Sequence, residues 1–280
     1  MRDPNTIEIV QSVTPDWLIS VFSVLTRFGG VSVLLAIACL YYWVGDRERS
    51  GYTFAVILGG LALLAGLKAT FAYPRPPAEL HLIATDSPSF PSGHAMGATV
   101  VYGILALSMD RFSNRGLRLA VAGVIVAIVS VPRIALGVHY PIDIGAGIVA
   151  GAGYLVLVTY TSRGDAYRAF LIAVAIALGG LVVGSIVGTT PNSTCLDGLC
   201  FDRDVLVATA AAGGGFMTWS RIDDRVNLDR WIYAIGVAGL AIFVVGITTL
   251  DVSTGILVAA AAIGIPAVLL LPKVIDRSQR

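Results

Sequence analysis

Charged residues are scarce in this chain. Asp, Glu, Lys and Arg make up 13% of its 280 residues, whereas hydrophobic residues make up 56%. A soluble domain carries roughly 25% charged residues, so the composition predicts an integral membrane protein. A basic stripe with interleaved aromatic residues is also lacking, which argues against nucleic acid as a partner. Residues 1–20 lack a basic segment followed by an apolar core, so we expect no cleavable signal peptide.

Long apolar runs fill most of the sequence, and a run of about 20 residues is enough to cross a bilayer as a helix. We therefore expect an all-α, polytopic membrane helix bundle with nine spans. The predicted spans are residues 28–44, 52–73, 94–109, 117–136, 141–160, 169–189, 205–219, 231–250 and 252–271. Ahead of them, residues 1–27 carry apolar side chains at helical spacing and predict helices that lie on the membrane surface. The alternative is a frayed extension of the first span.

Basic residues gather in alternate joins between these spans and in the C-terminal tail. They are Arg47, Arg49, Arg111, Arg115, Arg118, Arg163, Arg168, Arg221, Arg225, Arg230, Lys273, Arg277 and Arg280. Because cytoplasmic loops carry an excess of Lys and Arg, this side is predicted to be cytoplasmic. The expected protein is a multi-pass protein of the cell membrane with its N-terminus outside and its C-terminus in the cytoplasm.

Cysteines are few, at three in the whole chain. Cys39 falls within the first predicted span and is expected to be a packing residue. Cys195 and Cys200 share the predicted outer loop between the sixth and seventh spans, where an oxidising compartment permits a disulfide. The sequence alone leaves a disulfide and two free thiols open. A metal site there is the weaker alternative, because only Asp197 lies nearby as a further ligand.

Ionisable residues interrupt the apolar runs in a single region. They are Lys68, His94, Arg133, His139 and Asp143, with Arg75 just past the end of one run. A charge at membrane depth costs about 2.5 kcal/mol or more on insertion scales, so it indicates a functional site. Under the predicted topology, all six lie at the outer ends of the second to fifth spans. The remaining histidine, His81, lies outside this pattern and is expected to be an exposed loop residue.

Several of these residues suit the binding of a phosphoryl anion. Lys68, Arg75 and Arg133 can neutralise it, and the two arginines can bind its oxygens bidentately. Ser92 and Gly93 precede a predicted helix start, where backbone N–H groups can point at an anion. Glycine at position 93 also lets the backbone come close to a ligand.

The histidines and the carboxylate suit acid–base and nucleophilic work. His94 and His139 have ordinary pKa values near neutrality and can divide the proton transfers of a phosphoryl transfer. Asp143 follows His139 by four residues, in the first turn of a helix predicted to begin at Pro141. Its carboxylate can fold back onto the imidazole, fix its tautomer and stabilise its cation. No metal-ligand cluster accompanies them, so we expect neither a metal nor another cofactor.

These residues resemble the type 2 phosphatidic acid phosphatase (PAP2) superfamily. Its motifs are Lys-x6-Arg-Pro, Pro-Ser-Gly-His and Ser-Arg-x5-His-x3-Asp. This chain carries Lys68…Arg75-Pro76, Pro91-Ser92-Gly93-His94 and Arg133…His139…Asp143 at the same spacings, and the similarity covers about residues 52–160. One position departs from the family, because Pro132 stands where the motif has a serine. Proline removes a hydroxyl and a backbone N–H donor, which bears on rate or substrate preference.

The resemblance implies a membrane phosphatase that hydrolyses a lipid phosphate or a polyprenyl diphosphate from the outer face without a metal. It implies that His139 forms a phosphohistidine, that Asp143 orients it and that His94 protonates the leaving oxygen. The phosphoryl oxygens would be held by Lys68, Arg75, Ser92, Gly93 and Arg133. Two alternatives stay open. The chain can be a phosphotransferase of the same family that uses an alcohol acceptor, or a membrane protein that only binds or transports an anion.

The resemblance also divides the chain into predicted parts. Residues 28–162 form the PAP2-like catalytic membrane core, residues 1–27 an interfacial helical segment, and residues 163–280 a four-span extension. The extension carries faces rich in Gly and Ala that suit close helix packing. It can pack on the core, form a homo-oligomer interface or shape a path for lipids. The expected partners are membrane lipids and a lipid phosphate substrate.

Overall fold

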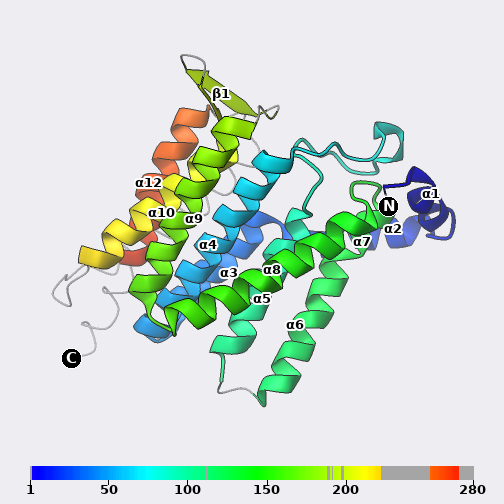
Figure 1. Cartoon of the computed structure of the whole chain (residues 1–280). Coiled ribbons are helices and arrows are strands. Elements are labelled where there is room, and N and C mark those ends of the chain that lie inside the picture. Colours follow the sequence, from blue (N-terminus) through cyan, green and yellow to red (C-terminus); the bar gives the residue numbers. More distant parts are fainter. Residues whose placement is uncertain are drawn as a thin grey trace.

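The computed structural model describes residues 2–110, 113–187, 190, 192–196, 199–221 and 253–270. Most of these residues are helical, and the sheet in this part of the chain is a single two-stranded hairpin (Figure 1). The prediction of a largely helical, membrane-type fold is therefore confirmed.

The N-terminal segment consists of short helices. They are α1 (Pro4–Ser12), α2 (Asp16–Leu25) and the 3-10 helix η1 (Thr26–Gly29). The side chain of Asp3 caps α1 by accepting from the backbone N–H of Asn5, and Pro4 takes the first helical position, which tolerates its missing N–H. The chain bends by 116° between α1 and the α2–η1 stretch. This pair has the length and composition of a broken span or a re-entrant loop, so a place on the membrane surface stays a prediction.

Longer helices make up the rest of the fold. The central ones are α3 (Val31–Val44), α4 (Arg47–Phe71), α5 (Gly93–Ser108), α6 (Arg115–Ser130), α7 (Pro132–Ala135) and α8 (Pro141–Ser162). They are followed by α9 (Ala166–Val187), α10 (Arg203–Arg221) and α12 (Thr254–Leu270). Short 3-10 helix η2 (Ala78–Leu80) lies in the long connection between α4 and α5.

Four stretches in the described part of the chain are long and apolar enough to cross a membrane: α4, the combined α6–α7 stretch, α8 and α9. Three shorter apolar helices, α3, α5 and α12, coincide with further predicted spans. Helix α10 coincides with the predicted span 205–219. The predicted span 231–250 lies outside the described residues. Nine crossings therefore remain a prediction, whereas several apolar helices of membrane type are present.

The connection between α9 and α10 differs from the expected irregular loop. It contains the antiparallel strands β1 (Ser193–Leu196) and β2 (Leu199–Asp202), in which Cys195 pairs with Cys200. These two cysteines form a disulfide. Strands of four residues are too short to give a periodic signal in the sequence, which is why the loop prediction missed them. Cys39 is a buried free thiol in the core, as expected.

Helix α4 lies at the centre of the packing. It contacts α3, α5, α9 and α10, and its glycines let neighbours approach closely. A Cβ placed on Gly66 would come within 3.1 Å of the Cα of Gly180 in α9. One apolar cluster joins Phe54 of α4 with Phe170 and Trp219 of the C-terminal helices. The C-terminal helices therefore share a hydrophobic core with the helix that carries Lys68.

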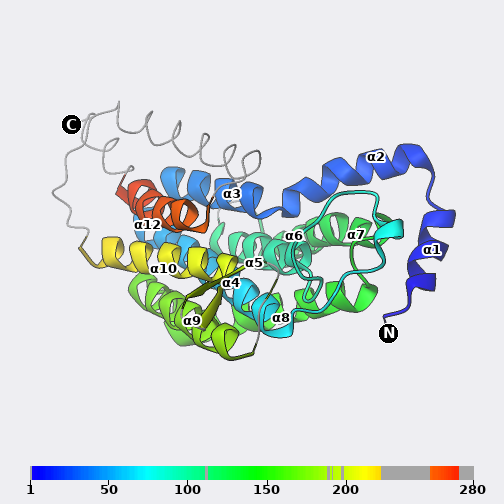
Figure 2. The same ribbon diagram turned by 90° about the horizontal axis from the view of Figure 1, so that it is seen from above.

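From α3 to α10 the long helices alternate in direction, so alternate connections meet at one end of the bundle (Figures 1 and 2). The end of α4, the start of α5 and the α7–α8 connection come together in this way. Helices α1 and α2 lie at the same end, next to α7. This arrangement brings the three motif segments into contact.

Candidate active site

Lys68 lies in the last turn of α4 and points at the loop that precedes α5. Its Nζ donates to Ser87 Oγ at 3.0 Å and to the carbonyl of Pro88 at 2.8 Å. A Cβ built on Gly93 would stand 3.8 Å from Nζ. The ammonium group is therefore beside the start of α5, where the sequence placed a phosphate site.

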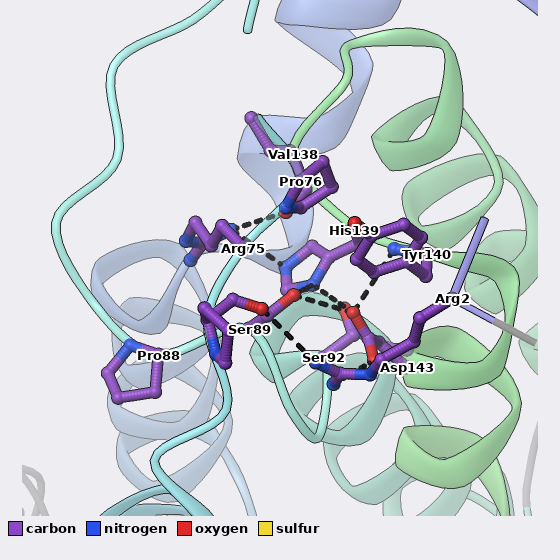
Figure 3. Close-up of polar contacts among 12 residues, drawn as sticks. Arg2, Arg75, Pro76, Pro88, Ser89, Ser92, Val138, His139, Tyr140 and Asp143 are labelled. Carbon is purple, nitrogen blue, oxygen red and sulfur yellow. Dashed lines mark hydrogen bonds and ion pairs between the residues drawn. The ribbon is translucent and has the colours of Figure 1, made fainter. Parts of the chain in front are cut away.

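Arg75 follows the end of α4 and reaches across to the α7–α8 connection (Figure 3). Its Nε donates to the carbonyl of Ser87 at 2.7 Å, and its Nη1 donates to the carbonyl of Val138 at 2.7 Å. The same Nη1 is 3.3 Å from Nε2 of His139. Burial lowers the pKa of Arg75 to about 10, so the guanidinium is still charged at neutral pH.

His139 and Asp143 lie together, as their spacing predicts. Both are buried, with 1% and 0% of their side chains exposed, and Nδ1 of His139 is 3.6 Å from Oδ2 of Asp143. The same Oδ2 accepts from the backbone N–H of Tyr140 at 3.1 Å. The carboxylate is thus fixed at the N-terminus of α8 on the Nδ1 side of the imidazole.

Ser89 joins this pair, although the sequence analysis did not single it out. Its Oγ donates to Oδ2 of Asp143 at 2.6 Å and lies 3.3 Å from Nδ1 of His139. Because a carboxylate and a hydroxyl oxygen both face Nδ1, this network assigns the ring proton to Nδ1. The lone pair of Nε2 then points to the side of Arg75.

The electrostatic surroundings keep His139 uncharged. Burial lowers the pKa of His139 to about 3, and the nearby cations Arg75, Arg133 and Lys68 add to this effect. The neighbouring carboxylate of Asp143 acts in the opposite direction but does not outweigh burial. At neutral pH the imidazole is therefore neutral and Nε2 is available as a nucleophile.

The turn that presents His139 depends on Gly137. Its φ of +75° lies in the left-handed region, and a Cβ there would stand 1.8 Å from the carbonyl oxygen of Leu80. The backbone N–H of Leu82 donates to the carbonyl of Leu136 at 3.1 Å and fastens the loop to the turn. Pro141 then begins α8, with Tyr140 as its N-cap.

The Pro-Ser-Gly-His segment begins α5 directly beside α8. Ser92 is the N-cap of α5, and its backbone N–H donates to the carbonyl of Asp143 at 3.0 Å. Glycine at position 147 is required for this approach, because a Cβ there would lie 2.8 Å from the carbonyl oxygen of Ser92. His94 follows in the first turn of α5 and packs against Gly29 of η1. A Cβ built on Gly29 would lie 3.2 Å from the imidazole ring.

Arg133 lies in the short helix α7 and is 5% exposed. Its Nε is buried without a hydrogen-bond partner among the described residues, as is the hydroxyl of Ser130. A buried guanidinium N–H without a partner is costly, and an anionic ligand oxygen would satisfy it. Pro132 takes the first position of α7, where an N–H is not needed, and α6 ends at Ser130. Pro132, which stands where the family motif has a serine, therefore lies between the end of α6 and the body of α7.

The structure brings all eight predicted site residues to one end of the bundle, at the ends of α4, α5, α7 and α8. It also brings Ser87 beside Lys68, and Ser89 and Arg2 beside Asp143, and none of these three was predicted from the sequence. Ser87 and Ser89 stand just before the Pro-Ser-Gly-His motif, but serine in a polar loop carries no distinguishing signal. His81, expected to be exposed, is half-buried, with Nε2 3.0 Å from the carbonyl of Pro76.

Three cations, Lys68, Arg75 and Arg133, therefore lie near the neutral, buried imidazole of His139. Among the contacts of the described residues, no acidic side chain faces its Nε2. Across the described ranges, no group of three or more His, Cys, Asp and Glu side chains is placed to hold a metal ion. The arrangement suits a phosphoryl group held by the cations and attacked by Nε2.

Comparison with known proteins gives consistent matches. Residues 50–167 match the family model of the PAP2 superfamily. Phosphatidylglycerophosphatase B of Bacillus subtilis (strain 168) is 28% identical over 145 residues, which are 48% of this chain and 70% of that protein. A solved structure, described as the first transmembrane PAP2 type phosphatidylglycerolphosphate phosphatase from Bacillus subtilis, is similar with a TM-score of 0.51. That match has 23% identity and covers 57% of this chain and 84% of the other, so it establishes a shared fold.

Proposed function

We propose that this chain is a membrane phosphatase that removes the phosphate from a lipid phosphate monoester, and the match of residues 50–167 to the family model of the PAP2 superfamily supports the proposal. The observation that carries this proposal is the placing of His139. Its Nε2 lies 3.3 Å from Arg75, and Asp143 and Ser89 hold its Nδ1 side. A non-catalytic anion site does not need an oriented, uncharged imidazole.

The proposed substrate class is a glycerophospholipid phosphate, with phosphatidylglycerol phosphate as the first candidate. The support is the similarity to phosphatidylglycerophosphatase B over 70% of that protein's length. Polyprenyl diphosphates carry the same terminal phosphoryl chemistry and are the second class to be tested.

In the first chemical step, Nε2 of His139 attacks the phosphorus, so that an N–P bond forms and the bond to the lipid oxygen breaks. Once the phosphoryl anion is bound, its negative charge favours the imidazolium form of His94, which gives its proton to the leaving lipid oxygen. The carboxylate of Asp143 stabilises the positive charge that develops on the ring of His139. Lys68, Arg75 and Arg133 neutralise the phosphoryl oxygens, together with the N–H groups at the start of α5.

In the second step, water attacks the phosphohistidine while neutral His94 accepts a proton from it. The N–P bond breaks, inorganic phosphate leaves, and both histidines return to their starting states. No step requires a metal ion. We place the site at the outer face of the cell membrane with the C-terminus in the cytoplasm, and the support is the concentration of Lys and Arg at the joins of the opposite end.

The test is phosphate release by the purified protein in detergent with a chelator present, from phosphatidylglycerol phosphate, phosphatidic acid, a polyprenyl diphosphate and a soluble sugar phosphate. We expect the lipid monoesters to react fastest and His139→Ala to lose at least about a thousandfold in kcat, the order seen when a nucleophile is removed. His81→Ala is the matched histidine control and should remain active. Full activity of His139→Ala would contradict the proposed chemistry, and transfer of the phosphoryl group to an added alcohol would reassign the reaction.

A further inference from the structure

Arg2 reaches the proposed catalytic carboxylate from the far N-terminal end of the chain (Figure 3). Its Nη2 donates to Oδ1 of Asp143 at 2.7 Å, and its Nη1 donates to the carbonyl of Pro74 at 3.2 Å. Asp143 has no exposed surface, whereas 26% of the Arg2 side chain is exposed. The guanidinium therefore covers the carboxylate on its solvent side.

Three aromatic rings surround this guanidinium. Its central carbon lies 4.7 Å from the ring centroid of Tyr73, 5.5 Å from that of Tyr140 and 5.6 Å from that of Phe90. Phe90 and Tyr73 also contact each other, with centroids 5.6 Å apart. Such rings attract a cation through their faces and restrict the plane of the guanidinium. Arg2 is therefore held in one orientation against Asp143.

Helix α1 fixes the position from which Arg2 projects. Ile7 is fully buried, and α1 packs on α7. The amide of Gln11 donates to the carbonyl of Leu80 at 2.9 Å and to that of Ala135 at 3.1 Å. These carbonyls belong to the two segments that frame the turn carrying His139. Arg2 is thus part of a docked element that is attached on both sides of the site.

The two oxygens of Asp143 have separate partners. Oδ2 faces His139 and accepts from Ser89 and the backbone of Tyr140, whereas Oδ1 accepts from Arg2. The last torsion of an aspartate has a broad minimum, so bonds to one oxygen alone leave the carboxylate some freedom to tilt about it. The bond to Arg2 removes this freedom and keeps Oδ2 towards the imidazole.

We infer that Arg2 is a positioning residue for the proposed phosphatase, which clamps Asp143 in the orientation that serves His139. The inference rests on the proposed function and adds to it a residue that lies outside the three motifs. Arg2 contacts Asp143 on the face away from Arg75 and Nε2, so it should affect kcat and leave the KM for substrate nearly unchanged.

The experiment compares Arg2→Ala, Arg2→Lys and Arg27→Ala in the phosphate-release assay, using protein that elutes as a single folded species. Arg27→Ala is the matched control, because it removes an exposed arginine from the same N-terminal segment. We expect Arg2→Ala to lose about tenfold in kcat, the order of one charge-assisted hydrogen bond. Arg2→Lys should recover part of this loss, and added guanidinium or methylguanidinium at millimolar concentration should restore activity to Arg2→Ala alone.

A purely structural role for Arg2 predicts a different pattern. Arg2→Ala would then have the kcat of Arg27→Ala, or a loss that follows its melting temperature and that guanidinium does not rescue, and either result overturns the inference. Failure of the proposed function is separately visible, because the wild-type protein itself would then release no phosphate. An active wild type with an equally active Arg2→Ala would overturn the clamp alone.

Discussion

At the residue scale, His139 has different partners on its two ring nitrogens. The Nδ1 side meets the hydroxyl of Ser89 at 3.3 Å and the carboxylate of Asp143 at 3.6 Å, whereas Nε2 meets Arg75 at 3.3 Å. The longer distance to Asp143 means that Ser89 completes the link between the two. A hydroxyl that accepts from Nδ1 and donates to Oδ2 can fix the imidazole of His139 and the carboxylate of Asp143 relative to each other.

Replacing Ser89 by alanine should therefore slow the reaction without unfolding the protein. Loss of the hydrogen bond to a charged acceptor predicts a decrease in kcat of about tenfold, with KM nearly unchanged. Ser108→Ala is the matched control, since its buried hydroxyl pairs with Thr53 at 2.8 Å at the opposite end of the bundle. Steady-state kinetics check the expectation, and equal kcat values for the two variants would refute the role of Ser89.

The motif residues could be predicted from the sequence because ionisable groups are expensive inside apolar runs. Lys68, His94 and Arg133 stood out for that reason, and the four-residue spacing placed Asp143 in a first helical turn from which its carboxylate can fold back onto His139. Ser89 and Arg2 could not be found in this way. A serine or an arginine outside the apolar runs is unremarkable until the fold brings it to the site.

At the element scale, the turn between α7 and α8 determines where His139 points. Gly137 adopts a left-handed φ of +75° against the carbonyl of Leu80. Helix α8 then begins at Pro141, so that Asp143 falls in its first turn. The hydrophobic periodicity predicted a helix boundary there but not the positive φ, which depends on the η2 loop packed against the turn.

The substitution Gly137→Ala tests this turn. A non-glycine residue at this φ costs about 1–3 kcal/mol from backbone strain alone, and the clash with Leu80 adds to it. We expect a lower melting temperature and a loss of activity. Gly145→Ala in α8 is the control, because a Cβ there meets nothing within 4 Å. If Gly137→Ala melted and reacted like Gly145→Ala, the turn would not constrain the site as described.

The elements that the sequence misjudged are those with weak local signals. Strands β1 and β2 are four residues each and are joined by the Cys195–Cys200 disulfide. Helices α3 and α5 lie where the sequence predicted spans, but with 14 and 16 residues they are shorter than a simple span. Apolar composition predicted where helices lie, but their length depends on caps such as Ser92 and on the loops around the site.

At the scale of the whole molecule, helices α9 and α10 pack directly on α4, the helix that bears Lys68. The α4–α9 contact is close because Gly66 and Gly180 face each other, with a built Cβ 3.1 Å from the opposing Cα. Small residues permit this approach between membrane helices. The rich Gly and Ala content predicted close packing, but the sequence did not identify α4 as the partner, since partner choice depends on distant residues.

Gly180→Leu should separate α9 from α4 and shift the end of α4. We expect a melting temperature several degrees lower and a reduced kcat, because overpacking a close contact typically costs about 1–3 kcal/mol. Gly179→Leu is the adjacent control, as a Cβ at Gly179 meets nothing within 4 Å. Thermal unfolding followed by tryptophan fluorescence would decide the question. If Gly180→Leu and Gly179→Leu changed the melting temperature and kcat equally, the close α4–α9 contact would not be what determines either quantity.

In the proposed reaction, His139 carries the phosphoryl group between lipid and water. The most direct measurement is rapid acid-free quenching of the enzyme with a lipid phosphate labelled in its terminal phosphate, in the presence of chelator, followed by peptide mapping. We expect a base-stable, acid-labile phosphate on the peptide that contains His139, formed before phosphate release and absent from His139→Gln. Turnover of the lipid without label on His139, or label on another residue, would rule out a phosphohistidine at this position.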